Sequence, residues 1–163
     1  MRSKSLLPLG ALIAAPAVAA GTGAGTVTVT IPQLSVAEYH RPYVAIWLEP
    51  AGGGTAQTLA VWYDVHKAGN EPGTKWLSEL RAWWRKGGRS LTLPANGISG
   101  ATQAPGPHTI ALPTLPAGHY VLNVEAARET GGRELVTVPI TIPAGAAHAS
   151  GKTELGAVTL SAR

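Results

Sequence analysis

The sequence predicts an all-β protein, a sandwich of two sheets with seven to eight strands and one inserted amphipathic helix. Three observations predict this class. Short segments of alternating polar and apolar residues recur along the chain, 20 glycines and 13 prolines supply turns between them, and a single segment has helical periodicity. The length of 163 residues, with 45% hydrophobic and 13% charged residues, is typical of one folded domain.

The strongest strand pattern lies in the second half of the chain. Residues 120–126 place apolar side chains on one face and Asn123 and Glu125 on the other. In the next strand, 135–142, Pro139 lacks the amide hydrogen of a central strand, so we expect an edge strand or a bulge. The other strand candidates are 26–31, 43–48, 58–65, 91–93, 108–112 and 154–160, with a hairpin loop at 51–54.

Residues 75–86 have the period of an amphipathic helix. Thr74 is the expected N-cap, and two glycines at 87–88 end the segment. We expect this helix to lie over an open end or face of the sandwich, with its indoles in the core and its basic face in solvent. The alternative is a cofactor site that combines a stacking plane from Trp83 or Trp84 with the cationic cluster Arg81, Arg85, Lys86 and Arg89.

The first 20 residues have the composition of a cleaved secretory signal peptide. Two basic residues precede an uncharged stretch rich in Ala and Leu, which ends in small residues. That stretch, 6–20, is shorter than the roughly 20 residues of a membrane span, and two prolines interrupt it. We therefore expect residues 1–20 to be removed on export and 21–163 to form one periplasmic domain, with no membrane insertion.

The charge and composition exclude several classes of partner and site. Of the 13 Lys and Arg residues, 2 lie in the signal segment, so 11 basic residues remain against 9 acidic ones. An excess of +2 gives no reason to expect nucleic acid as a partner. The absence of cysteine excludes disulfides, thiolate metal sites and a cysteine nucleophile, and the single aspartate, Asp64, argues against a calcium loop.

The sequence offers no convincing pair of acid and base residues for catalysis, so we expect no catalytic residues. The five histidines have no helical metal spacing. Asp64 and His66 fall on the same side of a predicted strand, a pair that a metal could use, but scattered hydrogen-bonding histidines are the better interpretation. We therefore expect no metal site.

The most informative motif for function is Ser99-Gly100-Ala101-Thr102. It resembles the acceptor motif of bacterial flavinylated proteins, including subunits of the sodium-pumping quinone reductase. In those proteins a flavin transferase cleaves FAD and joins FMN to the last threonine through a phosphoester bond. Small neighbours suit this chemistry because a foreign active site must close around one hydroxyl. The resemblance implies that Thr102 carries covalent FMN.

The motif departs from the family pattern at one position. The pattern begins with an aspartate three residues before the serine, where this chain has Asn96. Asn96-Gly97 is also a common turn signal, so a plain turn between strands is the alternative interpretation. The second function that the sequence leaves open is a non-catalytic periplasmic binding or adaptor module without flavin.

A wider resemblance covers most of the expected domain. The segments that carry it include Tyr39-His40-Arg41-Pro42-Tyr43, Leu59-Ala60-Val61-Trp62-Tyr63 and the residues 75–85, 99–106 and 155–158, in that order. Together they are similar to the predicted periplasmic proteins catalogued as domain of unknown function 2271. The resemblance implies an immunoglobulin-like fold and a redox setting, because such proteins are often encoded near flavin transferases and PepSY-type membrane proteins. Both are expected partners, in extracytoplasmic electron transfer.

Overall fold

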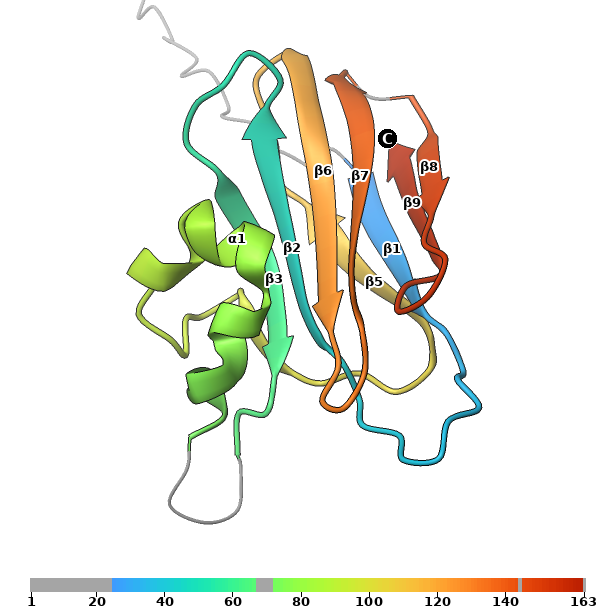
Figure 1. Cartoon of the computed structure of the whole chain (residues 1–163). Coiled ribbons are helices and arrows are strands. Elements are labelled where there is room, and N and C mark those ends of the chain that lie inside the picture. The colour runs from blue at the N-terminus through green and yellow to red at the C-terminus, as the bar shows by residue number, and fades with distance from the viewer. Residues whose placement is uncertain (1–24, 67–71, 144, 163) are drawn as a thin grey trace, which may run out of the picture.

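The computed structural model describes residues 25–66, 72–143 and 145–162. They form two sheets packed face to face, with a helical segment beside the larger sheet (Figure 1). This confirms the predicted all-β sandwich, with nine strands among the described residues rather than seven or eight. The expected signal peptide at 1–20 lies outside the described residues.

The smaller sheet has four antiparallel strands in the order β5-β1-β9-β8. Every second residue of β1 is buried, as the alternation predicted, because one face of this sheet packs on the larger sheet and the other meets solvent. The strands are β1 (Gly25–Ile31), β5 (Gly106–Leu112), β8 (Ala147–Ser150) and β9 (Ala157–Ala162).

The larger sheet has five strands in the order β4-β3-β2-β6-β7. All neighbours are antiparallel except β3 and β4, which are parallel. β7 lies at the edge, which confirms the expectation from Pro139. The strands are β2 (Tyr43–Pro50), β3 (Gln57–Tyr63), β4 (Ser99–Ala101), β6 (Gly118–Ala127) and β7 (Arg133–Ile142).

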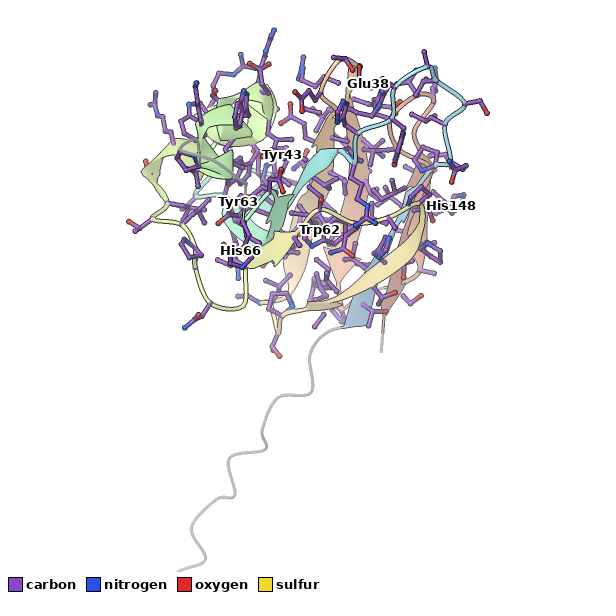
Figure 2. All side chains as sticks on the ribbon, turned by 90° about the horizontal axis from the view of Figure 1, so that it is seen from below. Glu38, Tyr43, Trp62, Tyr63, His66 and His148 are labelled. Atoms are coloured by element: carbon purple, nitrogen blue, oxygen red, sulfur yellow. The ribbon has the colours of Figure 1, made fainter. Side chains whose placement is uncertain are left out.

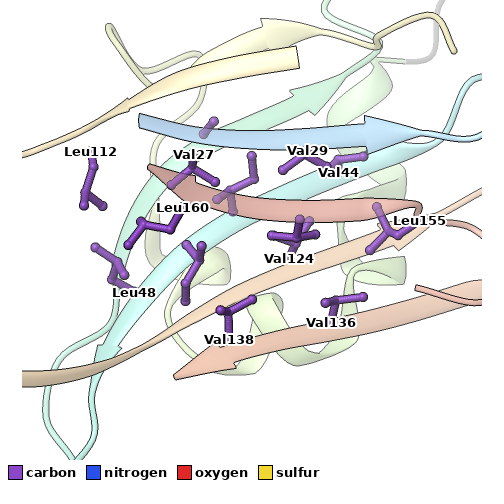
Figure 3. Close-up of a cluster of buried hydrophobic side chains, with 14 of the residues drawn as sticks. Val27, Val29, Val44, Leu48, Leu112, Val124, Val136, Val138, Leu155 and Leu160 are labelled. Atoms are coloured by element: carbon purple, nitrogen blue, oxygen red, sulfur yellow. The ribbon is translucent and has the colours of Figure 1, made fainter. Parts of the chain in front are cut away.

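The main hydrophobic core fills the space between the two sheets (Figure 3). Val27 and Val29 of β1 are fully buried, as are Leu122 and Val124 of β6. Burial of one such aliphatic side chain contributes about 1.5–3 kcal/mol to folding. Because the chain has no cysteine, this layer stabilises the sandwich without disulfides.

The helical segment differs from the single helix expected at 75–86. It consists of η1 (Gly73–Glu79), α1 (Arg81–Arg85) and η2 (Gly88–Ser90), and Thr74 does not cap it. A 3-10 helix has about three residues per turn. Leu77 lies in η1, Leu80 at the junction and Trp83 in α1, where residues three apart also share a face. All three are almost fully buried against the sheet.

These helices build a second core on the outer face of the larger sheet. Its sheet side includes Ala45 and Trp47 of β2 and Val61 and Tyr63 of β3. Both faces of β2 are therefore covered, which explains its continuous run of five buried residues. The expectation that the helix lies over a face of the sandwich is confirmed.

Three short segments differ from the sequence prediction. Residues 91–93 are not a strand, whereas β4 and β8 were not expected as strands. Both missed strands consist of Gly, Ala, Ser and His, which have little intrinsic preference for strands, so only their pairing with β3 and β9 identifies them.

Glu134 of β7 fixes the loop that leads into β9. Its carboxylate accepts hydrogen bonds from the backbone N–H groups of Lys152, Thr153, Glu154 and Leu155. Burial raises the pKa of Glu134, but these four donors lower it by more, so the pKa of the carboxyl lies below its usual value of 4.5. The ionised form is therefore the one that the fold stabilises.

We predict that Glu134→Gln lowers stability mainly above pH 4.5. A carboxyl with a depressed pKa in the folded state stabilises the fold above its unfolded pKa, and this contribution is lost as the pH falls through the folded pKa. Urea denaturation from pH 3 to 7 should show a difference in the free energy of unfolding between the wild type and the variant. This difference should become smaller below about pH 4.5. Leu135→Ala, an uncharged change on the same strand, should change the free energy of unfolding by an amount that does not vary with pH. A pH-independent change for Glu134→Gln as well would contradict the role given to the ionised Glu134.

Candidate functional site

A pocket of about 510 Å³ lies at one end of the five-stranded sheet. Its volume falls within the range of about 300–1,000 Å³ that is typical of small-molecule sites. The strand register explains its position, because the start of β2, the end of β6 and the start of β7 pair with one another. The ends of the parallel strands β3 and β4 also pair. The pocket lining contributed by these strand ends is Tyr43, Asp64, Thr102, Ala127 and Arg133.

Three further segments complete the pocket wall. They are the chain that precedes β2, the helical segment and the turn between β6 and β7. Their lining residues are Tyr39, His40 and Arg41, then Trp76, Glu79 and Arg81, then Arg128, Glu129, Gly131 and Gly132.

Thr102, the predicted acceptor, lines this pocket and is half-buried. Within the described part of the chain, no hydrogen bond to the Thr102 hydroxyl is recorded. The side chain is therefore neither in the core nor engaged in the fold. Thr102 shares the wall of this cavity with aromatic and cationic residues.

The other motif residues have structural roles of their own. The hydroxyl oxygen of Ser99 accepts a hydrogen bond of 2.9 Å from the backbone N–H of Ala95. A Cβ on Gly100 would lie 3.2 Å from Cδ1 of Trp62, so glycine suits this close packing of β4 on β3. Ala101 is exposed, and Asn96 lies in the exposed turn before β4, outside the pocket lining.

Two of the four pocket arginines are fixed by buried carboxylates. Arg128 donates to both oxygens of Glu154, at 2.8 and 3.1 Å, and this hydrogen-bonded pair raises the pKa of the guanidinium. The Glu154 carboxylate also accepts from the Gly132 N–H, and a Cβ on Gly132 would lie 2.8 Å from its Oε1. Arg133 donates to Glu125, which is fully buried, at 2.7 Å.

The other two arginines remain available to a ligand. Arg41 is exposed, and the structure records no carboxylate partner for it among the described residues. Arg81 is 62% exposed and lies 3.6 Å from Glu79, a long contact of the kind that contributes little in solvent. The pocket rim therefore offers two guanidinium groups to an anion.

The helix residues considered for a cofactor site are mostly elsewhere. Trp83 is in the core, with its Nε1 donating to the Thr58 hydroxyl at 3.0 Å, and Trp84 packs on the second core. The expectation that these indoles are core is thus confirmed. Of the basic cluster only Arg81 lines the pocket, because Lys86 pairs with Glu49 at 2.7 Å and Arg85 and Arg89 face solvent. The indole in the pocket wall is Trp76.

The Tyr39 hydroxyl is the exceptional polar group of the pocket. Its oxygen has almost no contact with solvent and no hydrogen-bond partner among the described residues. The neighbouring Tyr43 is satisfied, because its hydroxyl donates to the Gly73 carbonyl at 3.1 Å. Burial raises the pKa of Tyr43 above its usual value of 10.0, the Asp64 backbone opposes this shift, and the charge of Asp64 adds to it.

Of the Asp64 and His66 pair, only Asp64 belongs to the pocket. Asp64 lines the pocket, whereas His66 is absent from its wall, and both side chains contact solvent. Figure 2 shows His66 and His148 on opposite sides of the molecule. No cluster of three metal-ligating side chains occurs within the described ranges.

Sequence reasoning missed Tyr39, Arg41, Trp76, Arg128 and Arg133 as pocket residues. One available signal was Glu125, a carboxylate in a strand whose other face is core, because a buried carboxylate needs donors. That signal indicates a cationic partner without identifying it. The partner, Arg133, is eight residues away across a hairpin.

Comparison with known proteins identifies a family but no function. A protein-family model described as predicted periplasmic protein (DUF2271) matches residues 24–157. No curated protein and no solved structure shows significant similarity to this chain. None of the helices in the described residues has the length and apolar composition to cross a membrane.

We predict that Glu125→Gln loosens the helical segment and the pocket wall together. The Glu125 carboxylate accepts from the N–H groups of Ala82 and Trp83 at 3.1 and 2.9 Å and from Arg133. The amide NH₂ of a glutamine would face one of these N–H donors in place of an accepting oxygen. This should cost about 2–4 kcal/mol of stability.

Urea denaturation and hydrogen exchange at the Ala82 and Trp83 amides measure this effect. Glu129→Gln is the matched control, because this rim carboxylate is 66% exposed and lies 3.9 Å from the His40 ring, a long contact at the surface. Its stability should change by less than about 0.5 kcal/mol. Equal losses in the two variants would refute the role of Glu125.

Proposed function

The chain belongs to the DUF2271 family of predicted periplasmic proteins, and from that premise we propose that it carries FMN covalently on Thr102. In this proposal the protein is exported through its N-terminal signal peptide. It then serves as an electron carrier in the periplasm, and no catalytic residue of its own is required.

The observation that carries this proposal is the position of Thr102 in the pocket wall. Thr102 lines a cavity instead of lying in the core, and Trp76 and four arginines line the same cavity. Aromatic rings and guanidinium groups are the partners that a flat ring and a phosphate need. The residues present therefore fit the FMN group.

The proposed attachment is a transfer catalysed by a separate flavin transferase. The Thr102 oxygen forms a bond to the phosphorus of the FMN half of FAD, and the bond to AMP breaks. AMP leaves with the electron pair of that bond, and the hydroxyl proton passes to a base of the transferase. Because β4 is an edge strand of three residues, the acceptor lies where another protein can reach it.

Bound FMN supplies reversible uptake of one or two electrons. The chain's own part is to hold the group, exclude water from one side of it and set the local charge. The proposed partner is a membrane-bound redox protein of the PepSY type, which would exchange electrons with the carrier. The other redox partner is a periplasmic electron donor or acceptor.

The second candidate function is a binding or adaptor module without flavin. Asn96 favours it, because the family motif has an aspartate at this position. In this alternative the same pocket would bind a small anionic ligand through Arg41 and Arg81. The two functions differ in one measurable property, which is covalent modification of Thr102.

We predict that coexpression with a flavin transferase in the periplasm adds the mass of one FMN less one water. Intact-mass spectrometry of the purified protein measures this change, and absorbance near 450 nm provides a second readout. Thr102→Ala should remove both signals, because no nucleophilic oxygen remains. Thr109→Ala, which changes an exposed threonine of β5, is the control and should leave the labelling intact.

An unmodified wild-type chain under these conditions would refute the carrier function and leave the binding module. Label that persists in Thr102→Ala would place the attachment at another hydroxyl.

We predict that Asn96→Asp increases the fraction of labelled protein. The substitution restores the carboxylate of the family motif, and Asn96 is exposed in a turn, so the fold should not change. Labelling measured at short incubation with purified transferase and FAD compares the two rates. Equal rates would show that this position does not limit modification.

A further inference from the structure

Three features of the pocket indicate that a ligand binds inside it, in contrast to a group that is attached at its edge and extends into solvent. The first is the Tyr39 hydroxyl, whose oxygen is shielded from solvent and has no partner among the described residues. An unsatisfied buried hydroxyl costs free energy, and such groups are rare in folded proteins. Tyr39 itself lines the pocket, so a rotation of its side chain toward the cavity would give this hydroxyl a polar atom of a bound ligand as a partner.

The second feature is the aromatic wall. Trp76 is half-buried and lines the pocket, although the helical segment could bury its other tryptophans in the second core. The Lys75 ammonium lies 5.4 Å from the Trp76 ring centroid. An indole held at a pocket wall is a stacking surface for a flat conjugated ring.

The third feature is the division of the four pocket arginines, which share the wall with the carboxylates Asp64, Glu79 and Glu129. Arg128 and Arg133 are fixed by buried carboxylates, so their guanidinium groups keep a constant position in the wall. Arg41 and Arg81 are on the exposed rim. A ligand with a polar ring and a phosphate arm would meet fixed donors in the wall and adaptable cations at the rim.

We propose that the pocket is a binding seat for the flavin ring itself, with Trp76 and Tyr39 as its recognition residues. The inference rests on the proposed function, because Thr102 supplies the attachment point in the same wall. The ring of the attached group is then held in the pocket instead of being displayed in solvent. Attachment raises the effective concentration of the ring, so a weak intrinsic affinity is enough to keep it seated.

The seat is tested without the covalent bond. The full chain carrying Thr102→Val cannot be labelled, because it lacks the acceptor hydroxyl. This variant is titrated with riboflavin and, separately, with FMN, and flavin fluorescence is measured. We expect saturable quenching by both probes. In this background Trp76→Ala should weaken binding by about 10-fold or more, and Tyr39→Phe by about 3- to 10-fold.

Matched variants separate recognition from folding. Trp84→Ala removes a half-buried indole from the same helical segment but outside the pocket, and Arg85→Ala removes an exposed arginine one turn from Arg81. Both should bind riboflavin like the parent. Tyr39→Phe should also keep or raise the melting temperature without flavin, because it removes a hydroxyl that has no partner among the described residues.

Two results would overturn the proposal. One is the absence of saturable quenching up to about 1 mM flavin, the scale of the effective concentration that a short tether provides. The other is unchanged affinity in both Trp76→Ala and Tyr39→Phe. Binding in the Thr102→Val protein without labelling of the wild type would support the seat while the carrier function fails. Labelling of the wild type without flavin binding by the Thr102→Val protein would support the carrier function and refute the ring-binding pocket.

Discussion

The buried carboxylate of Glu125 is the interaction on which the pocket side of the molecule depends. It lies on β6 with no exposed surface, and it joins three parts of the chain. Its oxygens accept from the start of α1 and from Arg133 at the start of β7. A carboxylate at a helix N-terminus is favoured by the N–H groups there, which have no partner within the helix. One charge therefore connects the helical layer, the sheet and the pocket wall.

The pocket exists because the chain between β3 and β4 crosses the outer face of the sheet. Parallel neighbours need such a crossover, and here it is the helical segment. The crossover brings Trp76 and Arg81 to the sheet end where Asp64 and Thr102 leave their strands. An antiparallel β4 would have delivered Thr102 to the opposite end. Strand direction thus decides the chemical surroundings of this hydroxyl.

A second buried carboxylate, Glu154, repeats the arrangement on the other side of the β6–β7 turn. It binds Arg128 through both oxygens and the turn through the Gly132 amide. Two of the pocket arginines are therefore part of the fold, whereas Arg41 and Arg81 are not. Each fixed arginine has its own carboxylate, and the wall also contains Asp64, Glu79 and Glu129, so the pocket holds guanidinium groups without a large net charge.

The sequence alone determined the sandwich, the restriction of the Pro139 strand to an edge or a bulge, and the apolar face of the helical segment, because these depend on local period and on the missing amide of Pro139. It also singled out Thr102. Only the tertiary structure decided that Thr102 shares a pocket with Tyr39, Trp76 and the arginines, and that the helix divides at Leu80. Those outcomes depend on strand pairing and packing between distant segments, which residue period does not encode.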